Sequence, residues 1–187
     1  MKYLIVGLGN MGATYSQTRH NVGFVILDAL AEASGIPFQD KRFGFIARLN
    51  VKGRSFVLLK PTTFVNLSGR AVHYWLKKER LTEHNLLVVL DDLALPFGTL
   101  RMRSRGSDGG HNGLAHINQI LGTNNYARIR FGIGNEFRMG GQVDYVLGEW
   151  TEEERVALPE RTKTACDMII SFGLAGVTNT MNRFNNR

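Results

Sequence analysis

The stretch "IVGLGNMGATYSQTRHN" at residues 5–21 decides how the chain begins to fold. It closes an apolar run and carries the spacing G-x-G-x-x-G at Gly7, Gly9 and Gly12. A dinucleotide-binding fold needs a helix that opens at the third glycine and an acidic residue that ends a second strand about 20 residues later. Residues 13–20 are polar and have no apolar positions at helical spacing, so a helix packed on the sheet is not expected there.

The first helix is expected at about 21–34 instead, because apolar residues recur there at helical spacing. Asn21 is a candidate N-cap for it, and Gly35 is a candidate stop. Asp28 and Glu32, the carboxylates at the distance that a ribose contact requires, therefore fall inside this helix. The dinucleotide interpretation loses its ribose contact. A strand, a glycine turn and a long polar loop remain.

Composition favours one globular domain over 1–187 and an anionic partner. A chain of 187 residues with 43% hydrophobic content is long enough to bury a core. Lys and Arg exceed Asp and Glu by 23 to 16, which gives a net charge of +7 and a pI near 9.9. Such a charge fits nucleic acid or another acidic surface, although a merely soluble basic protein is the alternative.

The cysteine and apolar content predict a cytoplasmic protein. Cys166 is the single cysteine, so the chain has no disulfide framework and no thiolate metal cluster. No apolar run approaches 18 residues, and Gly7 interrupts the first one too early for a signal peptide. No membrane association is expected.

The apolar patterns predict an α/β fold. Strands are expected at 2–6, 43–50, 54–59, 86–91, 98–103 and 127–133, and helices at about 21–34, 67–79, 112–121 and 151–183. Lys52-Gly53 suggests a hairpin, and helices separate other strands, so the sheet should be mixed, mostly parallel, twisted and surrounded by helices. Thr151 and Glu154 form a capping-box pattern for the last helix, which a proline at 159 could kink or restart.

Two residues far apart in the sequence form a candidate general-base pair. Asp91 ends the apolar run 86–90, and ligands of α/β sheets collect at the carboxyl ends of strands. His20 lies in the loop after the first strand, which ends at the same edge. The carboxylate could orient one imidazole nitrogen so that the other takes a proton from water. Spacing alone favours a structural histidine and a loop or turn aspartate.

Three asparagines, Asn10, Asn66 and Asn112, lie at expected turns or helix starts. Each could serve only as a cap or turn residue, which is the commoner role. An amide NH₂ group can also donate to a carbonyl oxygen that gains negative charge during a reaction.

Arg101, Arg103 and Arg105 alternate with other residues, which predicts three guanidinium groups on one face of a strand and its exit. A solvated strand face is the alternative interpretation of this basic ridge. Metal binding is not expected, because His111 and His116 are five residues apart and no H-E-x-x-H occurs.

Six blocks together resemble the bacterial peptidyl-tRNA hydrolase family, in the family's order and over nearly the whole chain. They are "GLGN" at 7–10, "TRHNVGF" at 18–24, "KPTTFVNLSGRAV" at 60–72, "LDDLALPFG" at 90–98, "GGHNGL" at 109–114 and "RIRFGIG" at 128–134. The resemblance implies a monomeric α/β fold and hydrolysis, without metal or cofactor, of the ester that joins a peptide to the tRNA 3′ end. Its partner would be peptidyl-tRNA.

The resemblance also implies roles for individual residues. His20 would be the catalytic base and Asp91 its partner, and the three asparagines would hold the substrate and water and stabilise the tetrahedral intermediate. Gly109 and His111 would belong to a flexible loop that flanks the cleft. Contacts to tRNA are implied for Tyr15, Phe64, Arg101, Arg103 and Arg130.

The sequence departs from the family pattern at several positions. Val65 stands where Met is usual, Leu90 replaces the His before the catalytic Asp, and Ala94 replaces an acidic residue. Asn135-Glu136 stands where His-Pro is common. None of these changes removes a proposed chemical group, but they leave the shape of the cleft wall and the peptide preference open.

Two other functions compete with the hydrolase. Some relatives of this family act as splicing factors, so non-catalytic RNA binding is one alternative, and turnover of an N-acyl-aminoacyl-tRNA would separate the two. A dinucleotide-dependent enzyme is the other, and equilibrium dialysis with NAD or FAD would test it.

Overall fold

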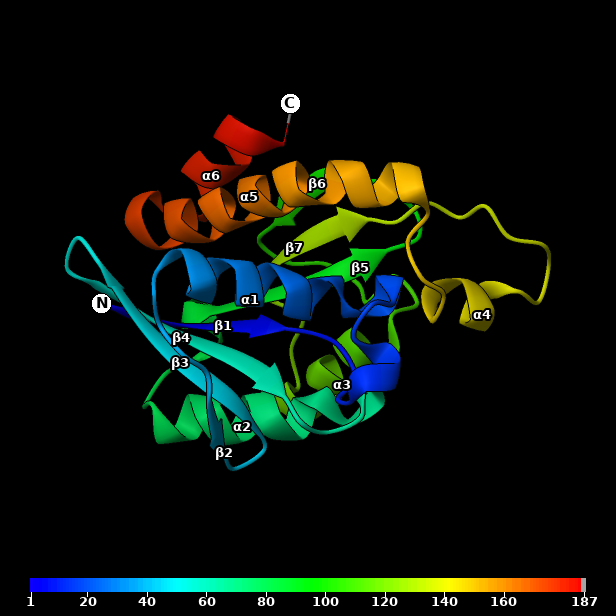
Figure 1. The fold of residues 1–187 in the computed structure, drawn as a ribbon. Coiled ribbons are helices and arrows are strands. Elements are labelled where there is room, and N and C mark those ends of the chain that lie inside the picture. The colour runs from blue at the N-terminus through cyan, green and yellow to red at the C-terminus, as the bar shows by residue number, and fades with distance from the viewer. Residues whose placement is uncertain (186–187) are drawn as a thin grey trace.

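Seven strands form one continuous sheet in a computed structural model that describes residues 1–185. The strands are β1 (Lys2–Gly7), β2 (Gln39–Lys41), β3 (Gly44–Val51), β4 (Arg54–Pro61), β5 (Leu86–Asp92), β6 (Leu100–Arg103) and β7 (Ala127–Gly132). Their order in the sheet is β2-β3-β4-β1-β5-β7-β6 (Figure 1).

Strand direction brings the functional loops to one edge of the sheet. β1 is parallel to β4 and β5, and β5 is parallel to β7. β3 is antiparallel to both β2 and β4, and β6 is antiparallel to β7. Five strands therefore point the same way, and only β3 and β6 oppose them. The expected mixed, mostly parallel sheet is confirmed, and the loops after β1, β4, β5 and β7 leave from a common edge.

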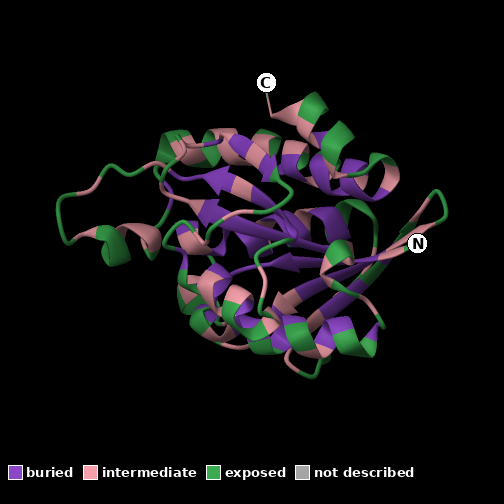
Figure 2. Ribbon diagram, turned by 180° about the vertical axis from the view of Figure 1, so that it is seen from behind, coloured by how far each residue is buried: buried purple, intermediate pink, exposed green. Residues whose placement is uncertain are grey.

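Helices cover both faces of the sheet (Figures 1 and 2). They are α1 (Val22–Ala33), α2 (Ser68–Lys78), α3 (Asn112–Leu121), α4 (Gln142–Val146), α5 (Glu152–Ala175) and α6 (Val177–Phe184). α1 and α5 pack on one face in a core that includes Ile5, Leu87 and Ile169. α2 and α3 pack on the other face in a core that includes Leu4 and Val88. Adjacent strand residues enter opposite cores, as the period of two requires.

Close packing explains Gly7 at the end of β1 and Gly23 in α1, but it does not explain Gly12 in the loop between them. A Cβ atom on Gly7 would lie 2.3 Å from the carbonyl oxygen of Gly23 at the start of α1, and one on Gly23 would lie 2.5 Å from the backbone nitrogen of Leu8. Gly12 has φ +105° and no atom within 4 Å of such a Cβ, so only its backbone conformation favours glycine. The helix begins at Val22 rather than at the third glycine, as predicted.

Most expected elements are confirmed within about two residues, which is the usual disagreement at element ends. The hairpin turn at Lys52-Gly53 is confirmed as well, since both residues have positive φ. The structure adds β2 and α4, which the sequence analysis missed. β2 has three exposed residues and α4 has five residues, so neither leaves a periodic apolar pattern.

The last expected helix is divided in two, and the side chain of Asn21 takes partners other than the amides of α1. The segment 151–183 forms two helices, and the break lies at Gly176, with φ +86°, while Pro159 lies inside α5. The capping box at Thr151 and Glu154 is present. Asn21 occupies the N-cap position of α1 but makes no capping bond. Its amide instead bonds to the backbone of the loop after β1.

Across residues 1–185, no helix combines the length and the apolar character needed to cross a membrane.

Candidate active site

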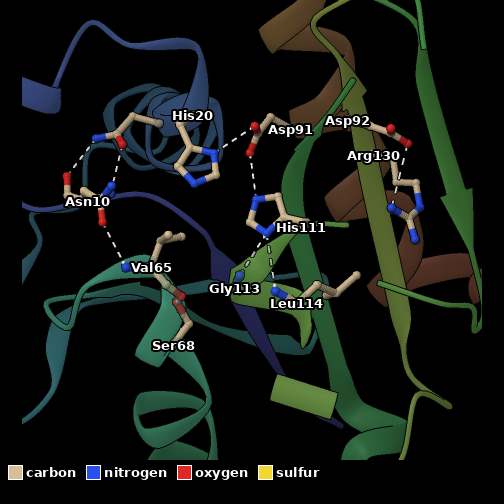
Figure 3. Close-up of polar contacts among 11 residues, drawn as sticks. Asn10, His20, Val65, Ser68, Asp91, Asp92, His111, Gly113, Leu114 and Arg130 are labelled. Atoms are coloured by element: carbon tan, nitrogen blue, oxygen red, sulfur yellow. Dashed lines mark hydrogen bonds and ion pairs between the residues drawn. The ribbon is translucent and has the colours of Figure 1, made fainter. Parts of the chain in front are cut away.

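Two histidines bind the same buried carboxylate at the end of β5 (Figure 3). Nδ1 of His20 lies 2.9 Å from Oδ2 of Asp91, and Nε2 of His111 lies 2.9 Å from Oδ1. The two imidazole rings are 4.9 Å apart. His20 comes from the loop between β1 and α1, and His111 immediately precedes α3. Asp91 is 4% exposed, so the two rings provide most of its polar surroundings.

The hydrogen bonds of His111 assign its tautomer. Its Nδ1 accepts from the backbone N–H of Gly113 at 3.1 Å and, more weakly, of Leu114 at 3.4 Å. A ring nitrogen that accepts carries no proton, so the proton of His111 lies on Nε2 and is donated to Asp91. An ionised carboxylate only accepts, so His20 also donates to it from Nδ1. Nε2 of His20 is then left with its lone pair free to accept a proton.

Electrostatics support this protonation pattern. Burial alone would raise the pKa of Asp91, but the positive charge of the two imidazoles when they are protonated, together with their hydrogen bonds, outweighs burial and holds its pKa below the ordinary range. Burial lowers the pKa of His20, whereas the charge of Asp91 and the hydrogen bond to it raise that pKa more, so the net direction is upward. Asp91 is therefore ionised near neutral pH, and His20 is a stronger base than an isolated histidine.

Asn10 is fixed beside these residues by its backbone and its side-chain oxygen. Asn21 Nδ2 donates to the carbonyl oxygen of Asn10, and the Asn10 N–H donates to Asn21 Oδ1, both at 2.8 Å. The N–H of Val65 donates to Asn10 Oδ1 at 2.9 Å. Among residues 1–185, the NH₂ group of Asn10 donates to no other group, so this amide keeps both of its donors for a ligand.

The other two asparagines are exposed and cap no helix. Asn66 follows Val65 in a short 3₁₀ turn, and Asn112 is the first residue of α3. The cap of α3 is His111, whose Nδ1 takes the place of the usual Ser, Thr or Asp oxygen. In the described part of the chain the side chains of Asn66 and Asn112 neither accept a capping bond nor donate to another group, so their NH₂ donors are free.

A small cavity of about 100 Å³ lies against this group of side chains. His20, Asp91, His111 and Asn112 line it, together with residues of α4. The guanidinium of Arg19 anchors α4, because it stacks 4.3 Å from the Tyr145 ring centroid and donates to the Tyr145 carbonyl oxygen at 3.2 Å. The missed helix α4 thus forms one wall of the site.

The arginines lie on one face of the sheet at its far edge. Arg101 pairs in register with Arg130, and Arg103 pairs with Arg128, on the antiparallel strands β6 and β7. Arg101 and Arg130 are half-buried, while Arg103 is exposed, and Arg105 lies beyond the end of β6. Arg130 also lines the cavity beside His20.

Arg128 is the functional candidate that the sequence analysis overlooked in this cluster. It is fully buried, and its guanidinium donates to four backbone carbonyl oxygens, those of Gly106, Ser107, Asn124 and Tyr126. A buried guanidinium needs such partners because leaving one unsatisfied is costly. Arg128 therefore ties the loop that precedes His111 to the sheet. The alternating arginines of "LRMRSR" at 100–105 predicted a basic surface on β6 but gave no sign of Arg128 on β7. The burial of Arg128 and its carbonyl partners show its role.

The remaining predicted residues lie around the cavity or on nearby loops. Gly109 has φ +61°, and a Cβ there would lie 3.1 Å from a guanidinium nitrogen of Arg130. His111 lies in the loop before α3, and its ring contacts Asp91 directly. Tyr15 is half-buried in a short 3₁₀ turn, and Phe64 is 68% exposed just before Val65.

The cluster of His20, Asp91 and His111 also meets the spacing of a metal site, because one ligand atom from each lies within 4.8 Å of the others. The nitrogens that face Asp91 already donate to it, so a metal bound there would displace both hydrogen bonds. Sequence spacing missed this grouping because the three residues belong to different elements.

A family model for peptidyl-tRNA hydrolase matches residues 4–187. The chain belongs to the peptidyl-tRNA hydrolase family. A peptidyl-tRNA hydrolase from Bacteroides fragilis is 60% identical over all 187 residues of both chains. One from Porphyromonas gingivalis is 57% identical over 185 residues, which cover 99% of this chain and 100% of that relative.

A solved structure supports the same family assignment. The crystal structure of a peptidyl-tRNA hydrolase from Acinetobacter baumannii is 33% identical in sequence and covers 98% of this chain and 94% of its own. The two structures superpose with a TM-score of 0.92. The α/β fold expected from the resemblance is thus confirmed for a member of the peptidyl-tRNA hydrolase family.

Departures from the family pattern remove none of the polar contacts described above. Val65 is buried and still provides the N–H that fixes Asn10. Leu90 is fully buried in the core beneath α2 and α3. Ala94 uses only its N–H, which donates to Asp92 Oδ1 at 2.8 Å.

Proposed function

We propose that this peptidyl-tRNA hydrolase cleaves the ester between a peptide and the tRNA 3′ end with a water molecule activated by His20 and Asp91. The contact of 2.9 Å between His20 Nδ1 and Asp91 Oδ2 carries the proposal, because it directs Nε2 of His20 toward proton transfer. The enzyme is proposed to act in the cytoplasm as a monomer and to return free tRNA to translation.

In the first step, Nε2 of His20 takes a proton from water while the water oxygen bonds to the ester carbonyl carbon. The carbonyl oxygen becomes negative, and the free amide NH₂ groups of Asn10, Asn66 and Asn112 are the donors available to stabilise it and to hold the substrate. In the second step, the bond between that carbon and the tRNA oxygen breaks. The protonated His20 gives its proton to the leaving oxygen, so the base is restored.

The same amides give a reason for selecting peptidyl-tRNA over aminoacyl-tRNA. A site that bonds to the peptide amide rejects a substrate that lacks this group, because buried polar partners are then left unpaired. A charged α-amine would also meet NH₂ donors rather than acceptors. We therefore expect hydrolysis to require an acylated α-nitrogen.

Contacts to the tRNA are proposed for Tyr15, Phe64, Arg101, Arg103 and Arg130. The three arginines lie on neighbouring strands, and Arg130 among them lines the cavity, where a guanidinium group suits phosphate oxygens. The loop with Gly109 and His111 lies between these arginines and the carboxylate, and we propose that it adjusts when substrate enters.

A direct test compares N-acetyl-aminoacyl-tRNA with its unacetylated counterpart. The wild-type chain should release amino acid from the first and far less from the second. His20→Ala should lower single-turnover cleavage at least about 10²-fold and leave tRNA binding nearly unchanged. Binding of tRNA by the wild type without cleavage would refute the proposal and favour a non-catalytic RNA-binding protein.

A further inference from the structure

The net positive charge of the chain is concentrated in one segment, and this segment does not include the basic ridge of Arg101, Arg103 and Arg105. Residues 41–78 contain nine of the 23 Lys and Arg residues and none of the 16 Asp and Glu residues. The remainder, with 14 basic and 16 acidic residues, has a net charge of −2. The net charge of +7 therefore originates in the segment that contains β3, β4 and α2. In the sheet, β3 and β4 lie toward the edge opposite to β6.

Within this segment, five basic residues form what is called here the α2 basic face: Arg42, Arg70, His73, Lys77 and Lys78. All five are exposed. Arg70, His73 and Lys77 follow one another at helical spacing along the outer side of α2 and span roughly 10 Å of its length. Arg42 is held beside them because Trp75 Nε1 donates to the Arg42 carbonyl oxygen at 2.9 Å.

The cations of this face lack acidic partners in the described part of the chain. None of its Lys and Arg side chains forms an ion pair with any residue in 1–185, whereas Arg48 pairs with Glu79 and Lys60 with Asp28 in the same segment. Lys77 and Lys78 lie in the last turn of α2 and favour its dipole. That explanation does not extend to Arg70, which lies in the first turn, where a cation is unfavourable.

Aromatic rings accompany these cations. The rings of Phe43 and Tyr74 pack edge to face with centroids 5.4 Å apart, and the Arg42 guanidinium lies 5.1 Å and 5.5 Å from them. Both rings line a shallow hollow of about 750 Å³ together with Arg70 and Lys77. Cations interleaved with aromatic rings are typical of surfaces that bind nucleic acid backbone.

The α2 basic face is continuous with the candidate active site. Phe64 and Asn66 lead through a 3₁₀ turn directly into α2, and Arg70 follows one turn later. α2 and α3 pack against each other (Figure 1). Ile129 and Phe131 of β7 enter the core beneath α1 and α5, so Arg130 between them lies on the sheet face that α2 and α3 cover. An extended polyanion that reaches the cavity from this side passes over the α2 basic face.

We infer that the α2 basic face is a second phosphate-binding surface for the tRNA part of the substrate, separate from the basic ridge on β6. This inference rests on the proposed function. The tRNA is the constant polyanion of that substrate, whereas the peptide varies and carries no fixed negative charge. The face contacts backbone phosphates, so it contributes affinity without base specificity.

The test uses the double variant Arg70→Gln, Lys77→Gln in the full chain. Its matched control is Lys163→Gln, Arg183→Gln, which removes the same charge from exposed positions on α5 and α6, on the opposite face of the sheet. Each variant is measured with N-acetyl-aminoacyl-tRNA and with a short substrate, the N-acetyl-aminoacyl ester of adenosine. Circular dichroism verifies that both variants fold.

We expect the α2 variant to raise KM for the full tRNA roughly three- to tenfold relative to the control. The slope of log K against log[salt] for tRNA binding should become shallower by about 1.4–1.8, the value for two lost phosphate contacts. The ratio of kcat/KM between full tRNA and short ester should fall by the same factor. Equal behaviour of the α2 variant and the control would overturn the inference, whereas a wild type that cleaves neither substrate would refute the proposed function itself.

Discussion

Replacing Asp91 by Asn tests the shared carboxylate most directly. Asp91 receives one N–H from His20 and one from His111, each at 2.9 Å. An asparagine keeps one accepting oxygen and presents an NH₂ group at the other position. His111 cannot change its tautomer easily, because its Nδ1 already accepts from the start of α3. His20 is therefore the ring that must adapt, and its proton moves from Nδ1 to Nε2.

This tautomer removes the base without removing the imidazole. General-base catalysis contributes about 10²–10⁴ in rate, so Asp91→Asn should lower the single-turnover cleavage rate by up to that factor while KM changes little. The assay is release of N-acetyl-amino acid from its tRNA ester with enzyme in excess. The volume of the side chain is conserved, so the thermal unfolding midpoint reports separately on the fold.

The neighbouring carboxylate provides the matched control. Asp92 accepts from the N–H of Ala94 and lies 3.8 Å from Arg130, and its side chain points away from His20 (Figure 3). Asp92→Asn removes the same charge one residue away and should change the cleavage rate less than about threefold. Equal losses in the two variants would refute the reasoning, because they would trace the effect to net charge rather than to the orientation of His20.

Four further predictions follow from the structure. Because His20 must be unprotonated to act and Asp91 raises its pKa, kcat/KM should fall as pH drops through a value above 6.5, and Asp91→Asn should move this limb to lower pH; a limb that stays in place would separate it from His20. Arg103→Ala should make the salt dependence of tRNA binding shallower by about 0.7–0.9, measured by filter binding between 50 and 200 mM salt. EDTA should leave hydrolysis unchanged, and inhibition reversed by Zn²⁺ would assign a metal to the histidine pair. Gly7→Ala should destabilise the fold by about 1–3 kcal/mol, seen in urea unfolding, because the added methyl meets the Gly23 carbonyl oxygen.

The sequence predicted the fold and the grouping of His20 with Asp91 for the same reason. Parallel strands end at one edge, so residues that follow them meet there regardless of their separation in sequence. That reasoning has no access to side-chain direction. The resemblance placed His111 on a loop beside the cleft, and only the structure shows that its ring turns inward to the carboxylate.

Other features leave no pattern in the sequence at all. α4 is five residues long, and Arg128 resembles any other arginine until its burial and its four carbonyl partners are known. Asn21 was assigned to a helix cap from its position, but its amide is used by the backbone of Asn10. Local rules name the residue types that can cap or bind, whereas tertiary packing selects which partner each one takes.

The hydrogen bonds of His111 connect the position of a helix to the basicity of a distant ring. Its Nδ1 accepts a hydrogen bond from the first amides of α3, and its Nε2 donates to Asp91. Asp91 in turn raises the pKa of His20. Any ligand that shifts the beginning of α3 must also alter this carboxylate. Under the proposed function, the ability of His20 to take a proton from water therefore depends on the position of Asn112, the first residue of the same helix.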